Sequence, residues 1–320
     1  MNVYDEPKRN IYTEIKREFI EDTNTPKTNI LNNKYRLIKI KQKGAFGSVY
    51  ESIDITTGKT VAIKQINNEF SSCIDTEIKA NNILNKAGCL HITKMLNHFS
   101  DEKSSYLVFE YSEIGDVITF AENHYSEYSE FVDKYTRDII RDVCIALFCC
   151  HKNNICHRDV KPENTLIFKV EDKVIYKLCD LGLSECSSKQ VLEGAGTKQY
   201  TAPEVYSNTG HYCDKSDMWS VGIMAYSLRY LRTPYGDMLA NERTPEYIFS
   251  RESLADYFYS AINRIKEEDF RSFLLGLLNI DPNKRMTARE ALKHPFLKRL
   301  NFLIIRVILR RRSSAARPWP

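Results

Sequence analysis

Residues 157–164 read HRDVKPEN, and this stretch decides how the rest of the chain is interpreted. Within six residues it places an acid, a lysine and an amide: Asp159, Lys161 and Asn164. It follows a helical stretch whose apolar residues recur with a period of about 3.6 residues. A second acid, Asp180, comes soon afterwards in the motif LCDLG. Charged and polar groups gathered directly after an apolar helix indicate a functional site.

These four side chains match the requirements of phosphoryl transfer, which depends on charge neutralisation, metal ligands and an oriented nucleophile. Asp180 and Asn164 offer the hard oxygen ligands that Mg²⁺ prefers. Asp159 offers a base that can orient a hydroxyl group, and Lys161 offers a positive charge for the moving phosphoryl group. The set therefore predicts an enzyme that transfers phosphoryl groups.

Two upstream segments are consistent with this chemistry. Residues 43–49, KGAFGSV, hold two glycines between strand-like runs, where a backbone can approach phosphate oxygens closely. Taken alone, the same glycines are more often those of an ordinary hairpin turn. Lys64, in VAIK, follows at a distance from which it could reach nucleotide phosphates, and Glu77 on a following helix could hold its ammonium group.

From about Tyr35 to Leu297 the sequence resembles the eukaryotic protein kinases. The matching motifs occur in family order: the glycine loop, VAIK at 61–64, Glu77, HRD at 157–159, DLG in place of DFG at 180–182, APE at 202–204, DMWSVG at 217–222, DPNKR at 281–285 and HPF at 294–296. The resemblance implies an α+β fold of two lobes with ATP bound between them. The N-lobe, residues 35–113, would hold five antiparallel strands and one helix, and the C-lobe, residues 114–297, would be mainly helical.

The resemblance also implies a role for each matching residue. Asp159 and Lys161 would be catalytic, and Asn164 and Asp180 would bind Mg²⁺. The residues implied to bind ATP are Gln42, Lys43, Gly44, Ala45, Phe46, Gly47, Ser48, Val49, Ala62, Lys64, Glu77, Glu110, Ser112, Asp116 and Leu166. In this set Lys64 would pair with Glu77, while Ala62, Val49 and Leu166 would enclose the adenine. Phe109 would be the gatekeeper residue, and Glu204 would form a structural ion pair with Arg285.

Two features favour serine and threonine over tyrosine as the acceptor. Lys161 stands two residues after Asp159, where tyrosine kinases typically carry a different pattern. Residues 196–204, GTKQYTAPE, resemble the GTxxYxAPE of serine/threonine kinases, in which Thr197 would bridge Asp159 and Lys161. The implied partners are therefore proteins with serine or threonine acceptors.

Two departures from the family pattern leave a second reading open. Gln42 replaces the first glycine of the loop, and Asn81 stands where the family usually places an apolar residue. A buried polar group at that place costs stability unless it is hydrogen-bonded. Both departures support the alternative of a pseudokinase or scaffold that binds nucleotide or partners without efficient catalysis.

The activation segment suggests a mode of regulation. Glu193 occupies the usual phosphothreonine position, and its carboxylate could pair with Arg158 and give basal activity without phosphorylation. Ser187 and Ser188 are rival sites that could be phosphorylated, and Glu193 could equally point to solvent.

The composition is that of a globular chain of 320 residues, with 42% hydrophobic and 28% charged residues. A net charge of +4 argues against a dedicated nucleic-acid binder. The polar residues at the start of the given sequence predict no secretory signal, and no run reaches the roughly 18 apolar residues that a membrane span needs. We expect residues 1–34 to be a flexible extension and residues 298–320 a basic tail.

Nine cysteines without a CxxC pair fit neither a zinc site nor a disulfide scaffold. They predict reduced thiols packed as small hydrophobic residues. The predicted protein is a cytoplasmic or nuclear monomer.

Overall fold

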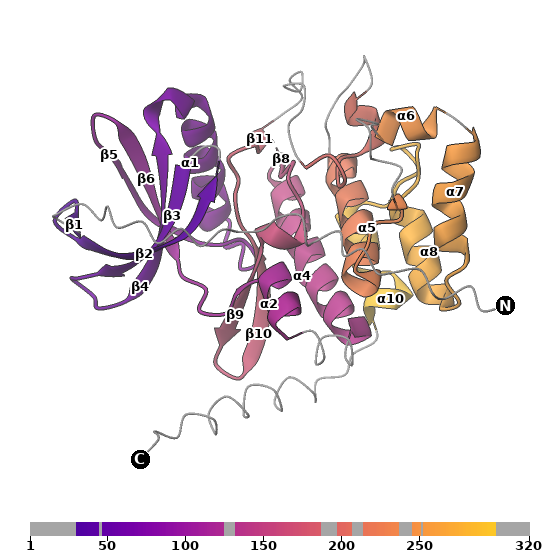
Figure 1. Ribbon diagram of the computed structural model, residues 1–320, viewed down its shortest axis with the longest axis horizontal. Coiled ribbons are helices and arrows are strands. Elements are labelled where there is room, and N and C mark those ends of the chain that lie inside the picture. The colour runs from indigo at the N-terminus through magenta and orange to yellow at the C-terminus, as the bar shows by residue number, and fades with distance from the viewer. Residues whose placement is uncertain are drawn as a thin grey trace.

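The computed structural model of the protein has two lobes of different composition. A small lobe is built on a curled antiparallel sheet, and helices make up most of the larger lobe (Figure 1). The described residues are 30–44, 47–124, 132–186, 197–206, 214–236, 245–250 and 252–298. The arrangement confirms the predicted α+β, two-lobed fold.

Six antiparallel strands form the sheet of the small lobe, in the order β1-β2-β3-β4-β6-β5. Their bounds are β1 Ile30–Leu31, β2 Tyr35–Gly44, β3 Gly47–Asp54, β4 Thr60–Asn67, β5 Met95–Ser100 and β6 Ser104–Glu110. The sequence predicts five of these strands. The additional strand, β1, pairs Ile30 with Arg36 and Leu31 with Tyr35, ahead of the predicted start of the lobe. Its two residues are too few to show an alternating pattern.

Gly47 begins β3 and lies opposite Ile66 of β4. A Cβ atom at this position would lie 1.8 Å from the carbonyl oxygen of Gln65, so any side chain would clash with the backbone of β4. The requirement for glycine is therefore a close approach of two strands. Of the other predicted loop residues, Ala45 and Phe46 lie outside the described residues.

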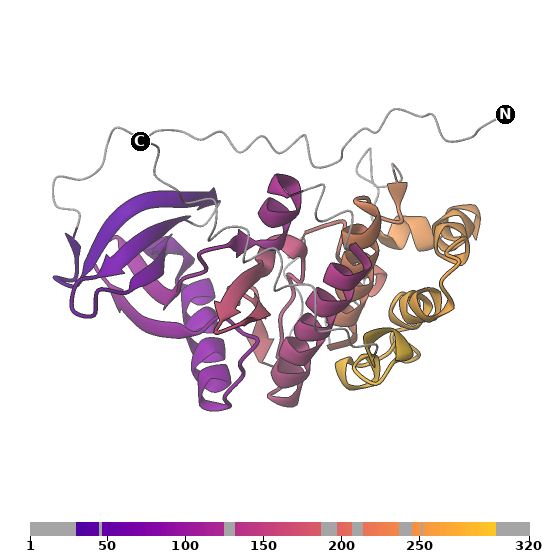
Figure 2. The same ribbon diagram turned by 90° about the horizontal axis from the view of Figure 1, so that it is seen from below.

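The helix α1 (Ser71–Lys86) packs on this sheet (Figures 1 and 2). Ile74 from its first turns joins Ile66 and Leu107 of the sheet in a buried cluster. The sequence predicts a helix only from Glu77 onward. The preceding serine, cysteine and β-branched residues have low helix propensity, and packing of Ile74 on the sheet compensates for it.

The larger lobe is built around α5, which is buried on nearly every side. Its helices are α2 (Val117–Asn123), α4 (Val132–Lys152), α5 (Asp214–Tyr230), α6 (Pro245–Phe249), α7 (Glu252–Asn263), α8 (Glu268–Leu277), α9 (Ala288–Ala291) and α10 (Pro295–Lys298). Residues 216–228 of α5 are all buried, as expected of a helix at the centre of a large domain. Among the described residues, none of the helices has the length and apolar character needed to cross a membrane.

Short strands and single turns make up the rest of the regular structure among the described residues. They are β7 (Gly115–Asp116), β9 (Thr165–Val170) and β10 (Lys173–Leu178) in one sheet, β8 (Ile155–Cys156) paired with β11 (Glu185–Cys186), and the single turns η2 (Asn68–Phe70), η3 (Pro162–Asn164) and η4 (Pro203–Tyr206). The sequence pattern missed the β9–β10 hairpin. Its turn contains no glycine, and Glu171 adopts the left-handed conformation (φ 54°) in its place.

The predicted pair between Glu204 and Arg285 is confirmed. Arg285 is fully buried, and its Nη1 and Nη2 atoms donate to the two carboxylate oxygens of Glu204 at 2.7 and 3.0 Å. It also donates to the carbonyls of Lys215 and Asn279, and its guanidinium group lies 5.1 Å from the centre of the Trp219 ring. One side chain therefore joins η4, the start of α5 and the segment before α9.

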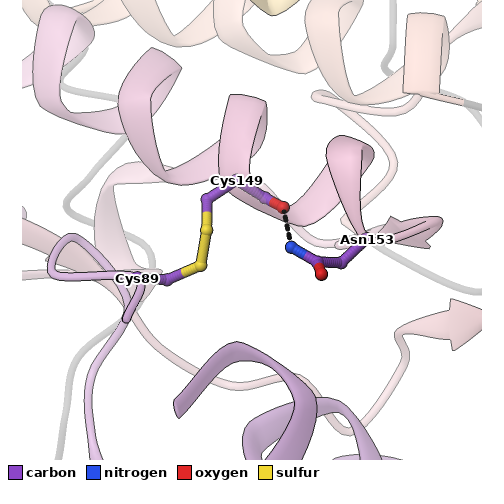
Figure 3. Close-up of a disulfide and its surroundings, with 3 residues drawn as sticks. All are labelled: Cys89, Cys149 and Asn153. Atoms are coloured by element: carbon purple, nitrogen blue, oxygen red, sulfur yellow. Dashed lines mark hydrogen bonds between the residues drawn. A yellow bond between two sulfur atoms is a disulfide. The ribbon is translucent and has the colours of Figure 1, made fainter. Parts of the chain in front are cut away.

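The structure contradicts the prediction that all the cysteines are free thiols. Cys89 and Cys149 form a disulfide, with Cα atoms 6.1 Å apart (Figure 3). The two residues are 60 positions apart, so their pairing depends on tertiary contact and leaves no short spacing pattern. None of the other five cysteines whose side chains the structure describes is part of a disulfide: Cys73, Cys144, Cys150, Cys156 and Cys179.

Replacement of Arg285 by alanine should lower the free energy of unfolding by about 3–5 kcal/mol, since it breaks a buried ion pair by removing one partner. Urea unfolding followed by circular dichroism would measure this loss. Lys284→Ala is a matched control, because Lys284 is an exposed neighbour and should change stability by less than about 0.5 kcal/mol. Equal effects of the two substitutions would contradict the structural role of Arg285.

Candidate functional site

The Lys64 ammonium group joins three segments at the junction of the lobes. On β4, its Nζ lies 2.8 Å from Glu77 Oε2 of α1 and 2.8 Å from Asp180 Oδ1, which follows β10. Gly182 is close to all three groups, and a Cβ atom there would lie 3.3 Å from both Asp180 Oδ1 and Glu77 Oε2. The predicted Lys64–Glu77 pair is therefore confirmed, and a side chain at position 182 would require the neighbouring carboxylates to shift by a few tenths of an ångström.

The two carboxylates favour the charged form of Lys64, whereas burial raises the pKa of Glu77 above its ordinary value. Burial alone would lower the pKa of Lys64, but the carboxylates of Glu77 and Asp180 outweigh it and raise that pKa above its ordinary value. Partial burial raises the pKa of Asp180, and the Lys64 ammonium group more than reverses the effect, so this pKa lies below its ordinary value. The Asp180 side chain remains 44% exposed, so an ionised carboxylate is available to a ligand.

A second cluster surrounds Asp159. Its Oδ2 lies 2.7 Å from Lys161 Nζ and accepts a hydrogen bond from Asn164 Nδ2 at 2.8 Å. Its Oδ1 accepts from the backbone N and the hydroxyl of Thr197, at 3.2 and 3.0 Å. The Thr197 hydroxyl in turn accepts from Lys161 at 2.7 Å. The predicted bridge of Thr197 between Asp159 and Lys161 is confirmed, and the carboxylate is fixed on both of its oxygens.

The buried carboxylate of Asp217, on α5, fixes the segment that carries this cluster. It accepts from the backbone N of His157 and of Arg158, each at 2.9 Å, and contacts His151 Nε2 at 2.8 Å. Arg158 and Asp180 both adopt positive φ angles, 71° and 66°. Backbone strain of this kind persists where surrounding contacts over-determine it, and it is common at functional sites.

The segment between the lobes holds the other predicted nucleotide contacts. The Glu110 carboxylate accepts from Lys94 N at 2.8 Å and from Lys177 Nζ at 2.6 Å. The Ser112 hydroxyl is buried and donates to the carbonyl of Ile167 at 2.6 Å. These bonds hold the connecting segment against both lobes and leave its shape well defined.

Asp116 has a structural contact in addition to its predicted one with the ribose. Its carboxylate oxygens accept from the backbone N and the hydroxyl of Thr119, at 2.9 and 2.8 Å, and so cap α2. Its neighbour across the β7–β9 pairing is Leu166, one of the residues predicted to enclose the adenine. The ribose contact stays a prediction.

The remaining predicted ATP contacts lie on the small-lobe sheet. Gln42 pairs with Val49, and Lys43 with Ser48, across β2 and β3, and Gly44 pairs with Gly47 at the turn. Val49 in turn lies opposite Lys64 on β4, so the glycine segment and the lysine share one stretch of sheet. Ala62 is two positions before Lys64 on the same strand, as in the sequence motif.

Asn81 is buried, as the resemblance predicts for that position, and is only 2% exposed. Its Nδ2 donates to the carbonyl of Glu77 within α1, at 2.9 Å. Its amide oxygen has no hydrogen-bond partner among the described residues. Burial of an unpaired amide oxygen costs about 1–3 kcal/mol. The helix that carries Glu77 therefore contains a destabilising group close to the ion pair.

Two positioning contacts were not predicted from the sequence. The His151 contact with Asp217 and the Lys177 contact with Glu110 both join residues more than 60 positions apart. Neither His151 nor Lys177 belongs to a short motif, so no local signal could have identified either residue. Glu193, Ser187 and Ser188 lie outside the described residues, as does the basic tail after Lys298.

Comparison with known proteins agrees with this geometry. The family described as protein kinase domain matches residues 35–297. The serine/threonine-protein kinase RAD53 of Saccharomyces cerevisiae is 29% identical over 85% of this chain and 34% of its own length. A calcium/calmodulin-dependent protein kinase type I of Schizosaccharomyces pombe is 29% identical over 84% of this chain and 79% of its own length. The calcium/calmodulin-dependent protein kinase cmkA of Emericella nidulans is 30% identical over 82% of this chain and 62% of its own length.

The family match runs from β2, in the small lobe, to α10, at the end of the described C-lobe. It thus takes in both charged clusters and the elements that hold them. The chain spans about a third of RAD53, so the similarity concerns the domain and not the whole of that relative. Since the match covers most of the sequence, the chain belongs to the protein kinase family.

Proposed function

We propose that the protein transfers the γ-phosphoryl group of ATP to serine or threonine hydroxyls of protein substrates, with Mg²⁺. The observation that carries the proposal is the arrangement of Asp159, Lys161 and Thr197, joined by contacts of 2.7–3.2 Å. The intact Lys64–Glu77 pair supports it, because it belongs to an arrangement competent for phosphate binding.

The residues present fit a magnesium ion. Asp180 offers an exposed, ionised carboxylate and Asn164 an amide oxygen, and Mg²⁺ usually takes only one or two protein ligands beside phosphate oxygens and water. These two residues would hold the ion. When bound, it supplies positive charge that neutralises the phosphates.

Each protein side chain has a distinct task in the proposed reaction. The Asp159 carboxylate accepts the proton of the substrate hydroxyl and aims its oxygen at the γ-phosphorus. The Lys161 ammonium group offsets the charge on the transferred group. The Lys64 ammonium group, held by Glu77, binds the phosphates that remain on the nucleotide.

The choice of serine and threonine rests on Lys161 and on the names of the relatives. Lys161 occupies the position typical of serine/threonine kinases, and Thr197 fixes it beside Asp159. RAD53 is named a serine/threonine-protein kinase. A peptide array with serine, threonine and tyrosine acceptors would test the choice, and label confined to tyrosine peptides would contradict it.

Asp159→Asn should lower kcat by about 10²–10⁴-fold, the usual contribution of a general base. The amide keeps the size of the side chain, so the protein should still fold and bind nucleotide. Transfer of radiolabel from ATP to a generic protein substrate would measure the effect. Asp172→Asn, in the exposed β9–β10 turn, is the matched control and should retain full activity. Near wild-type turnover of Asp159→Asn would refute its assigned role.

Thr197→Val should reduce kcat by about 10–150-fold, which corresponds to the loss of about 1.5–3 kcal/mol in hydrogen bonds to charged groups. Valine keeps the shape but cannot bridge Asp159 and Lys161. Thr197→Ser keeps the hydroxyl and should retain most of the activity. Steady-state kinetics with both variants separates the effect of the hydroxyl group from that of side-chain shape. Equal losses of kcat in the two variants would show that the hydroxyl is not the important feature.

The alternative, a pseudokinase or scaffold on the same fold, is favoured by one observation, the unpaired amide oxygen of Asn81. Leucine has nearly the same shape as asparagine. Asn81→Leu should therefore raise the free energy of unfolding by about 1–3 kcal/mol and leave or increase phosphoryl transfer.

Thermal unfolding and radiolabel transfer on the same preparation would check this prediction. Asn81→Asp is the opposite control, since it buries a charge and should destabilise the protein. A wild-type protein that binds ATP but transfers no label, even with leucine at position 81, would favour the scaffold.

A further inference from the structure

The loop between α1 and β5, residues 87–94, is hydrogen-bonded to the larger lobe. Thr93 N donates to the carbonyl of Leu178 at 2.8 Å, and Leu178 N donates to the carbonyl of His91 at 2.9 Å. His91 Nδ1 also donates to the carbonyl of Tyr176 at 3.1 Å. These bonds attach the loop to β10, so the C-terminal end of α1 is held by the lobe opposite its own sheet.

The disulfide adds a covalent link at the same place. Cys89 lies in this loop, and Cys149 lies in the last turns of α4 (Figure 3). The carbonyl of Cys149 accepts from Asn153 Nδ2 at 2.8 Å, so the end of α4 is itself well ordered. The bond therefore connects the end of α1 directly to the helix that precedes the Asp159 segment.

The bond is accessible, whereas the neighbouring thiols are not. Both of its cysteines are only partly buried, and the adjacent residues Leu90 and Phe148 are 73% and 38% exposed. Cys150, next in sequence to Cys149, is completely buried, and burial raises the pKa of its thiol. A buried, protonated thiol does not exchange readily. Exchange with a small thiol is thereby confined to the Cys89–Cys149 pair on this side of α4.

We propose that Cys89 and Cys149 form a reversible redox site, closed by a small disulfide of the glutathione type and opened by the corresponding thiol. In closure, the thiolate of one cysteine attacks a sulfur atom of the oxidant and releases one thiol. The second cysteine then displaces the other half from the mixed disulfide. The two protein thiols are oxidised, and their two electrons and two protons reduce one oxidant to two small thiols.

The state of this site affects the position of α1. The same helix carries Glu77 to Lys64, and its Asn85 Nδ2 donates to the carbonyl of Met95 at 2.9 Å, beside the loop. The Lys64–Glu77 pair is formed in the structure with the disulfide closed. Opening the bond leaves the hydrogen bonds of the loop but removes its covalent link to α4. The closed form is therefore the one that favours the ion pair and tighter nucleotide binding.

The test uses the full chain, equilibrated with either oxidised or reduced glutathione and then alkylated. The variants are Cys89→Ser, Cys149→Ser and the control Cys73→Ser, a free and partly exposed cysteine in the first turns of α1. Peptide mapping should find the Cys89–Cys149 crosslink in oxidised wild type and in the control. The shift of the melting temperature by ATP should be larger for the oxidised form, and only in these two proteins.

The kinetic effect rests on the proposed kinase activity. Reduction should lower kcat/KM for ATP by about two- to thirtyfold, the usual range for coupling through a packed network, with no response in Cys89→Ser. If the chain transfers no phosphate in either state, the proposed function fails, while the peptide map and the melting temperatures still decide the redox site.

Three results would overturn the redox proposal. One is the absence of the crosslinked peptide after oxidation. Another is an equal redox response of wild type and Cys89→Ser, which would point to a different thiol, such as Cys179 beside Asp180. The third is a crosslink that changes neither the ATP-dependent melting temperature nor kcat/KM, which would make the bond a structural link only.

Discussion

The structure depends on a single ammonium group shared by two carboxylates. Lys64 Nζ lies 2.8 Å from Glu77 and 2.8 Å from Asp180, which come from α1 and from the segment after β10. A charge at this depth is stable only when it is paired, so each of the three segments depends on the other two for a stable position. The same contact therefore fixes the relative position of the lobes and presents the Asp180 carboxylate.

A second buried charge, the Asp217 carboxylate of α5, sets the geometry of the Asp159 segment. Asp217 accepts hydrogen bonds from two successive backbone N atoms, and this holds Arg158 in its positive-φ conformation. The hydrogen bonds that offset the strain of that conformation come from the buried helix α5 and not from the segment itself. The site thus divides into a part carried by the larger lobe and a part, Lys64 and Glu77, carried by the small lobe.

The sequence predicts those parts of the fold and site that lie within short motifs. The charged residues at 157–164, the VAIK lysine and the β2–β4 strands all carry local signals, because each lies within a short, continuous stretch of sequence. Contacts between distant segments carry none. The disulfide, the His151–Asp217 contact and the Lys177–Glu110 pair each depend on how whole elements pack. The β9–β10 hairpin was missed for a different reason, since Glu171 takes the place where glycine usually marks the turn.

The buried guanidinium group of Arg285 has a consequence for how the chain is made. Its partners, Glu204 and the carbonyl of Lys215, come from segments synthesised long before it. Until residue 285 has been synthesised, the Glu204 carboxylate lacks its cation and the Lys215 carbonyl lacks its donor. The Trp219 ring likewise lacks its contact with the guanidinium group. Domains of this size fold as units during synthesis, from the N-terminus onward. The larger lobe therefore completes its core only after residue 285 has been synthesised.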